Sequence, residues 1–140
     1  MNQDYILRMI EQLGAALIQM RRAILGGSAA AGEVEQTLRR AAGGAGMDLD
    51  LARATTTEGL IAMIAPTGEV DPMRCWILAE LFLTEGLDRS HHGDPDGATA
   101  ALKKSAALFR LLGPEAVIAG YPEAAERLAE IERLLEEPTT

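Results

Sequence analysis

Apolar residues recur along the start of the chain at alternating spacings of four and three residues, the repeat of an amphipathic helix. The pattern predicts a helix over residues 4–25, which Gly26 and Gly27 end. Gly14 and Ala15 lie beside the apolar stripe and leave room for a close neighbour. The stripe consists of Ile6, Ile10, Leu13, Leu17, Met20 and Ile24. It fits either a helix on its own core or a seam between two chains, and spacing leaves both open.

Weaker helical patterns follow between glycine-rich segments. Residues 28–46 and 47–54 each predict a short helix, and a Thr55-x-x-Glu58 capping box predicts another that ends before Pro66. The glycine clusters could suggest a phosphate-binding loop. No strand pattern precedes them, however, and no Gly-Lys-Ser/Thr follows, so we interpret them as joints between helices.

The segment after Asp71-Pro72 is apolar on nearly every side. Asp71 is a favourable capping residue and proline suits the first helical position, so a helix should begin here and continue to His91. From Cys75 to Leu83 only Glu80 interrupts the apolar residues. A helix that is apolar all round must be covered all round, so we expect this one at the centre, with Trp76 buried.

Two more helices complete the predicted fold. Asp94-Pro95 repeats the start signal for a helix that Gly113-Pro114 closes, and residues 123–136 form a last amphipathic helix that packs through Leu128 and Ile131. The expected fold is all-α: a compact bundle of about six to seven helices in one domain, residues 1–140. Residues 1–46 form an N-terminal helix pair, a possible dimerisation arm, and residues 47–140 form the helical core.

The hairpin at residues 79–112 resembles one tetratricopeptide unit. An aromatic residue is followed four positions later by a glycine, then by a Gly-Asp turn, and then by small and bulky apolar residues at fixed distances. These positions are Phe82, Gly86, Gly93-Asp94, Ala98, Leu102 and Ser105. The resemblance implies two antiparallel helices in close contact. No second copy occurs at the family's 34-residue period, so it does not imply the family's peptide-binding groove. The rest of the chain is similar to a group of small bacterial helical proteins, which transfers no activity.

The acidic charge lies in the second part of the chain. Residues 1–54 hold six acids and six bases, whereas residues 55–140 hold fifteen acids and seven bases, which gives the net charge of −8. An acidic surface repels phosphate backbones and anionic headgroups, so we expect neither nucleic acid nor membranes as partners. Arginine outnumbers lysine and alanine is abundant, which is typical of GC-rich bacterial genomes.

A cytoplasmic location is expected. The chain starts without a basic region followed by an apolar one, so no signal peptide is predicted, and no apolar run approaches the roughly 20 residues of a membrane span. The single cysteine, Cys75, excludes an intramolecular disulfide.

Three candidates for chemistry have simpler explanations. His91 and His92 point about 100° apart on a helix and do not converge as metal ligands do. Cys75 lies in the most apolar helix, far from any histidine, and is predicted to be a core residue. Glu80 could be a buried functional carboxylate, a residue on a narrow solvent-facing strip, or the partner of an arginine such as Arg53 or Arg74. No catalytic, metal or cofactor site is therefore predicted.

The function expected from these patterns is that of a non-enzymatic protein-interaction or scaffold module. Its expected partner is a second copy of the chain, held through the stripe on the first helix. The alternative is a small-ligand protein with a pocket between the central helix and the hairpin, lined by Trp76, Glu80, Phe82 and Phe109. An enzyme would need a site made of carboxylates or completed by a partner.

Overall fold

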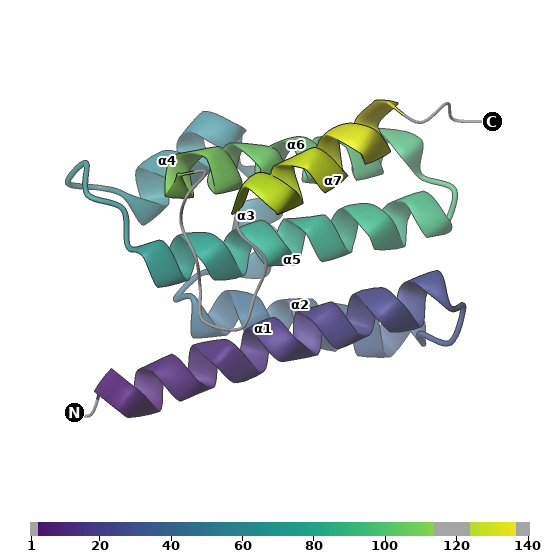
Figure 1. Cartoon of the computed structure of the whole chain (residues 1–140), viewed down its shortest axis with the longest axis horizontal. Coiled ribbons are helices and arrows are strands. Elements are labelled where there is room, and N and C mark those ends of the chain that lie inside the picture. Colours follow the sequence, from purple (N-terminus) through teal and green to yellow (C-terminus); the bar gives the residue numbers. More distant parts are fainter. Residues whose placement is uncertain (1–2, 114–123, 137–140) are drawn as a thin grey trace.

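Seven α-helices make up the described part of the chain, residues 3–113 and 124–136, and no strand occurs within it (Figure 1). In this computed structural model they are α1 (Gln3–Leu25), α2 (Ala31–Gly44), α3 (Leu49–Ala54), α4 (Thr57–Ile64), α5 (Pro72–His91), α6 (Pro95–Leu112) and α7 (Ala124–Glu136). The helices pack on one another, and the expected all-α bundle is confirmed.

Capping side chains set the helix starts. Asp71 accepts hydrogen bonds from the backbone N–H groups of Met73 and Arg74 (3.0 and 3.4 Å), and Asp94 accepts one from Gly97 (3.0 Å). A proline follows each aspartate, as the sequence predicted. The start of α4 differs by one residue from the prediction, because the cap is Thr56 rather than Thr55.

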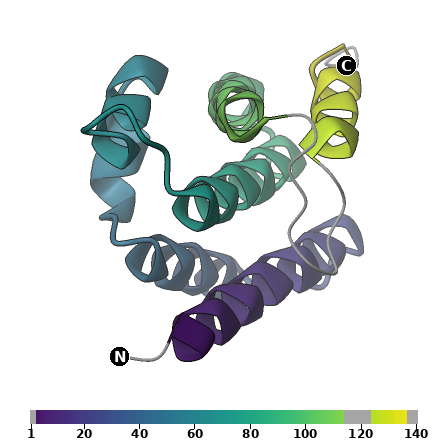
Figure 2. The same ribbon diagram turned by 60° about the vertical axis from the view of Figure 1, so that its left-hand side comes forward.

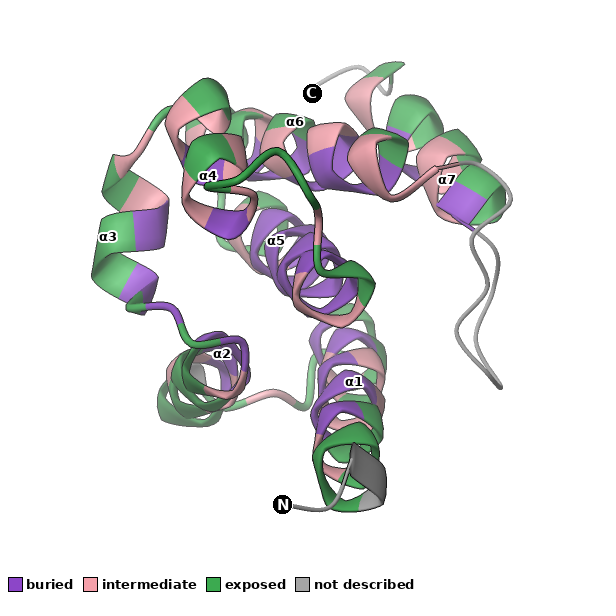
Figure 3. Cartoon of the chain, turned by 90° about the vertical axis from the view of Figure 1, so that its left-hand side faces the viewer, coloured by how far each residue is buried: buried purple, intermediate pink, exposed green. Residues whose placement is uncertain are grey.

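The central position belongs to α5 (Figures 1 and 2). On one side α1 and α2 pack against it, on the other side α6 does, and α7 packs on α6. The short helices α3 and α4 form an arm that joins α2 to α6 along a third side. Every residue from Cys75 to Leu87 is buried, and Trp76 is among the largest fully buried side chains. Much of α5 accordingly has the colour of buried residues in Figure 3. The prediction of a fully covered central helix is confirmed.

Two glycines allow α5 to approach its neighbours closely. A Cβ at Gly14 would collide with the ring of Trp76, with Cζ3 only 2.8 Å away, so α1 reaches α5 at this point because of the glycine. A Cβ at Gly86 would lie 2.7 Å from Cγ and Cδ2 of Leu102. The antiparallel helices α5 and α6 therefore meet through a glycine on one and a leucine on the other.

The apolar stripe of α1 lies mostly on the chain's own core. Ile10, Leu13, Leu17 and Ile24 are buried and belong to the hydrophobic core, and Met20 packs partly against it. Ile6, at the outer end of the helix, is 39% exposed. The stripe as a whole therefore cannot be the seam between two chains, because four of its six residues already pack within one.

Candidate functional site

Glu80 lies in the middle of α5, fully buried and paired with two arginines. One is Arg21 of α1, whose Nη2 lies 3.2 Å from Oε1, and the other is Arg127 of α7, whose Nε lies 2.9 Å from the same oxygen. Arg21 also donates to the hydroxyl of Thr84 (3.2 Å) and to the carbonyl of Glu80 (3.4 Å). One buried carboxylate thus joins the first, the central and the last helix.

The partners expected for Glu80 were wrong. Arg53 binds Glu85 instead, and Nε of Arg74 donates to the backbone carbonyl of Ala45 (2.7 Å). The sequence did carry a signal for Arg21, which sits on the stripe of α1 four residues after Leu17 and three before Ile24. Burial of an unpaired charge is unfavourable. A cation on an apolar helix face and an acid inside an apolar run are therefore expected to pair with each other.

The Glu80 cluster holds three helices together through ion pairs and hydrogen bonds. Both carboxylate oxygens accept hydrogen bonds from guanidinium groups. Burial lowers the pKa of Arg21 despite the neighbouring Glu80, because the guanidinium is deprived of water.

The residues expected to form a ligand pocket belong to the core. Trp76, Glu80, Phe82 and Phe109 are all buried, and the three aromatic rings are part of one continuous apolar cluster. Core packing accounts for Trp76 and Phe109, and ion pairing accounts for Glu80. Phe82 has a second role, because its ring also borders a cavity beside α3.

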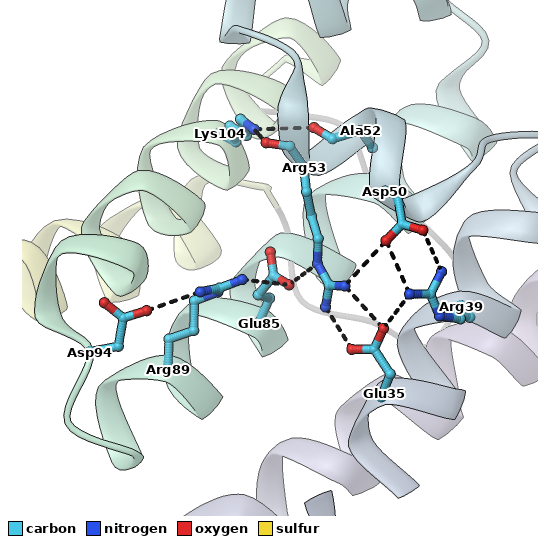
Figure 4. Close-up of polar contacts among 9 residues, drawn as sticks. All are labelled: Glu35, Arg39, Asp50, Ala52, Arg53, Glu85, Arg89, Asp94 and Lys104. Carbon is cyan, nitrogen blue, oxygen red and sulfur yellow. Dashed lines mark hydrogen bonds and ion pairs between the residues drawn. The ribbon is translucent and has the colours of Figure 1, made fainter. Parts of the chain in front are cut away.

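A network of charged side chains borders that cavity through Arg53, Glu85 and Arg89. Arg53 of α3 lies at the centre of the network (Figure 4). Nη1 and Nη2 of Arg53 bind both carboxylate oxygens of Glu35 on α2, at 3.0 and 2.8 Å, and its Nε binds Glu85 on α5 at 2.6 Å. The hydrogen bond to Arg53 lowers the pKa of Glu35, and the two carboxylates raise that of Arg53. This arginine thus links α2, α3 and α5.

Further ion pairs extend the network at both ends, and one of them joins Arg39 to Glu35 at 2.8 Å. On one side Arg39 of α2 binds Asp50 of α3 at 3.0 Å, and on the other Arg89 of α5 binds Asp94 at 2.9 Å (Figure 4). The Gly97 amide and then Arg89 hold the pKa of Asp94 below its usual value. Charges of opposite sign therefore alternate from α2 to the turn between α5 and α6.

Lys104 of α6 completes the network without an ion pair in the described part of the chain. Its Nζ donates to the carbonyls of Ala52 and Arg53, at 3.1 and 2.8 Å, and lies 5.3 Å from the centre of the Phe82 ring. These carbonyls end α3, where the helix dipole is negative and a cation is favoured. Burial lowers the pKa of Lys104, with Glu85 acting in the opposite direction.

The cavity at this network has a volume of about 210 Å³ and is formed by three helices. Arg53 comes from α3, Phe82, Glu85 and Arg89 from α5, and the small residues Gly97, Ala100 and Ala101 with Lys104 from α6. None of these was among the candidate site residues except Phe82. Their sequence positions are far apart, and no local motif marks them.

A second hollow, of about 540 Å³, lies between α1 and α2 and is more apolar. Met9, Leu13 and Ala16 of α1 border it, together with Gly43 and Gly44 of α2, and Gln12 and Arg40 stand at its polar edges. Leu13 packs so closely on Gly44 that a Cβ there would collide with it, whereas the space next to Gly43 is open. We call this hollow the α1–α2 groove.

The remaining candidates for chemistry show no assembled site. His91 and His92 border a small cavity of about 140 Å³ with Asp88, and Nδ1 of His92 lies 2.8 Å from the carbonyl of Asp88. Among the described residues, no three histidine, cysteine, aspartate or glutamate side chains converge to hold a metal ion. Cys75 is buried, as predicted, and donates a hydrogen bond to the carbonyl of Leu108 (3.1 Å).

Comparison with known proteins gives no relative for this chain. No protein-family model, curated protein or solved structure matches it. Of the helices in residues 3–113 and 124–136, none combines the length and the apolar character needed to cross a membrane.

Proposed function

We propose that this chain is a non-enzymatic protein-interaction module that self-associates through its N-terminal helix. The observation that carries the proposal is an apolar surface at the outer end of α1, which continues into the α1–α2 groove. Tyr5, Ile6 and Leu7 are 65%, 39% and 42% exposed. Large apolar side chains grouped at one helix end beside an apolar groove are typical of a contact site.

The exposed end exists because α1 extends beyond its neighbours (Figure 1). Leu13 packs on Gly44, the last residue of α2, so the turns of α1 before Leu13 continue past the end of α2. Tyr5, Met9, Gln12 and Ala16 follow one another at spacings of four, three and four residues and share one helix face. The groove and the exposed end therefore form one surface along α1.

This surface suits a second copy of the chain, because it carries both a projection and a hollow. In a dimer with twofold symmetry the same patch meets itself, so Tyr5 and Ile6 of each copy would enter the groove of the other. Charge favours the same arrangement. Residues 1–54 are neutral, whereas residues 55–140 carry the net charge of −8, so two copies meet without repulsion only through their N-terminal parts.

The tetratricopeptide-like hairpin supports a structural role for the rest of the chain. Its first helix, α5, is the central core helix and has no face left for a ligand peptide between Cys75 and Leu87. The single cysteine is free and buried, as is common for proteins of reducing compartments. We propose the bacterial cytoplasm as the location of this protein.

Mass measurement by light scattering over micromolar to sub-millimolar concentrations tests the proposal. The mass should rise from 14.9 kDa towards twice that value. Ile6→Glu should weaken the dimer by about tenfold or more, because it would place a carboxylate in an apolar contact. Leu25→Glu is the matched control, since Leu25 is an exposed leucine at the other end of the same helix.

A second variant keeps the outcome independent of folding. Gly43→Met would extend a side chain from a residue that lines the groove, at a position where a Cβ meets no other atom within 4 Å. Glycine disfavours helix by about 1 kcal/mol relative to good helix formers, so this variant should fold at least as well as the original chain while losing the dimer. A monomeric mass at every concentration, or an unchanged dimer in both Ile6→Glu and Gly43→Met, would overturn the proposal.

A further inference from the structure

The cavity between α3 and the α5–α6 hairpin is lined mainly by cations and small side chains. Three cationic groups face it, Arg53, Arg89 and Lys104, against one carboxylate, Glu85. Small-molecule pockets usually measure roughly 300–1,000 Å³. A cavity of about 210 Å³ is therefore too small for a cofactor and suits an ion or the charged end of a ligand.

Existing contacts hold the cations in position. Glu35 and Glu85 fix the Arg53 guanidinium through three hydrogen bonds of 2.6–3.0 Å. Lys104 is fixed by the two carbonyls at the end of α3 and by the Phe82 ring. A site whose donors are already oriented loses little conformational entropy when an anion binds.

Donors remain for a ligand, above all on Arg89. A guanidinium offers five N–H donors, and Arg89 makes one hydrogen bond within the described part of the chain, to Asp94. Its Nη2 lies 3.8 Å from Glu85, an ion pair without a hydrogen bond. Lys104 contributes a positive charge that no carboxylate in the described region pairs with directly.

Gly97 lets the side chains of Asp94 and Arg89 lie directly against the start of α6. A Cβ at Gly97 would collide with the carboxylate of Asp94 and lie 2.9 Å from Nη1 of Arg89. Ala100 and Ala101 add only methyl groups to the wall that α6 contributes. Of the side chains that α6 contributes to the lining, only that of Lys104 is larger than a methyl group.

We propose that this cavity binds a small oxyanion of phosphate size, held by Arg89 and Lys104 with Arg53 beside them. Guanidinium groups match the geometry of phosphate oxygens through paired hydrogen bonds, and a lysine adds a point charge. Glu35 and Asp94, outside the lining, pair with Arg53 and Arg89, so the charge of Lys104 is the one that an anion would balance. The site is separate from the α1–α2 groove and does not depend on self-association.

Isothermal titration with sodium phosphate, against sodium chloride of equal ionic strength, tests the site. We expect saturable binding of phosphate with one site per chain and none of chloride. Ala100→Glu adds a negative charge at an exposed lining residue without removing any present contact. It should weaken phosphate binding by about tenfold or more, because charges a few ångströms apart interact by several kcal/mol near a protein surface.

Two matched variants decide whether the effect is local. Ala100→Lys should strengthen phosphate binding, whereas Lys103→Gln, which changes the net charge by the same amount as Ala100→Glu, lies at an exposed position outside the lining and should leave affinity within about twofold. Arg89→Gln should weaken binding by about tenfold or more through the loss of charge-assisted hydrogen bonds. Absence of saturable phosphate binding, or equal losses in Ala100→Glu and Lys103→Gln, would overturn the site.

Discussion

Arg21 on α1 and Glu80 on α5 form an ion pair in the core, with Nη2 of Arg21 3.2 Å from Oε1 of Glu80. Arg21 is 5% exposed and Glu80 is fully buried. Removal of two charges from water is costly, and only their mutual attraction and further hydrogen bonds repay the cost. Thr84 and Arg127 supply those further bonds, so the pair depends on three helices arriving at one place.

Removal of either partner should therefore be destabilising. Glu80→Gln should lower the free energy of unfolding by about 3–5 kcal/mol, because it leaves the buried guanidinium of Arg21 without a carboxylate. Arg21→Gln should lower it by less, because Arg127 still pairs with Glu80. The double variant should lose less than the sum of the two. Urea unfolding of the four proteins measures the coupling, with exposed Glu58→Gln as a control. Additive losses would mean that the two residues do not depend on each other.

The helices could be predicted from the sequence because their signals are local. Asp71-Pro72 and Asp94-Pro95 mark helix starts within a few residues, and the glycines and prolines mark the ends. The apolar run from Cys75 to Leu83 predicted the central helix for the same reason. Each of these signals reflects steric and hydrogen-bonding constraints that act within one or two helical turns.

The partners of the charged residues could not be predicted in the same way. Arg21 and Glu80 are separated by 59 positions, and Arg53 and Glu85 by 32. Their pairing depends on helix packing that no local pattern specifies. The stripe of α1 was ambiguous for a related reason, since an apolar face looks the same whether it covers the chain's own core or a second chain.

The close contacts at Gly14 and Gly86 lead to a second prediction. Gly14→Ala and Gly86→Ala should each destabilise the fold by about 1–3 kcal/mol, because the added methyl group overpacks against Trp76 or Leu102. Gly32→Ala is the control, since it lies in α2 with open space around it and should be neutral or stabilising. Thermal unfolding of the three variants separates crowding from helix propensity. Equal effects at the three positions would contradict close packing at Gly14 and Gly86.

The network around Arg53 should make stability depend on acid pH. The hydrogen bond to Arg53 lowers the pKa of Glu35 from its ordinary value of 4.5, so the folded state favours the charged carboxylate. This contribution is present above that value and is lost as the pH falls through the lower pKa of the folded state. Glu35→Gln should make the acid side of the stability profile shallower, whereas Glu58→Gln should not. Identical acid profiles for Glu35→Gln and the original chain would contradict the role of this pair.

Cys75 should be unreactive in the folded protein. Burial, with a smaller contribution from Asp71, raises the pKa of its thiol to about 12 from 9.0, and the thiolate is the form that reacts with disulfide reagents. A chromogenic disulfide at mildly alkaline pH should therefore modify the chain only after urea has unfolded it. Rapid modification of the native chain would show that the thiol is open to solvent.

The raised pKa of the Cys75 thiol should also make the stability of the fold decrease at alkaline pH. Between about pH 9 and 12 the unfolded chain loses the thiol proton while the folded chain keeps it, so rising pH favours unfolding. The free energy of unfolding should fall by up to about 1.4 kcal/mol per pH unit across this range, in addition to the effects of other groups. Cys75→Ala removes the thiol, so the free energy of unfolding of this variant should fall less steeply above pH 9 than that of the original chain. The smaller side chain should also lower its stability at every pH. If the free energies of unfolding of the two proteins changed in parallel above pH 9, the thiol would have the same pKa in the folded and the unfolded chain. That result would contradict the burial of Cys75.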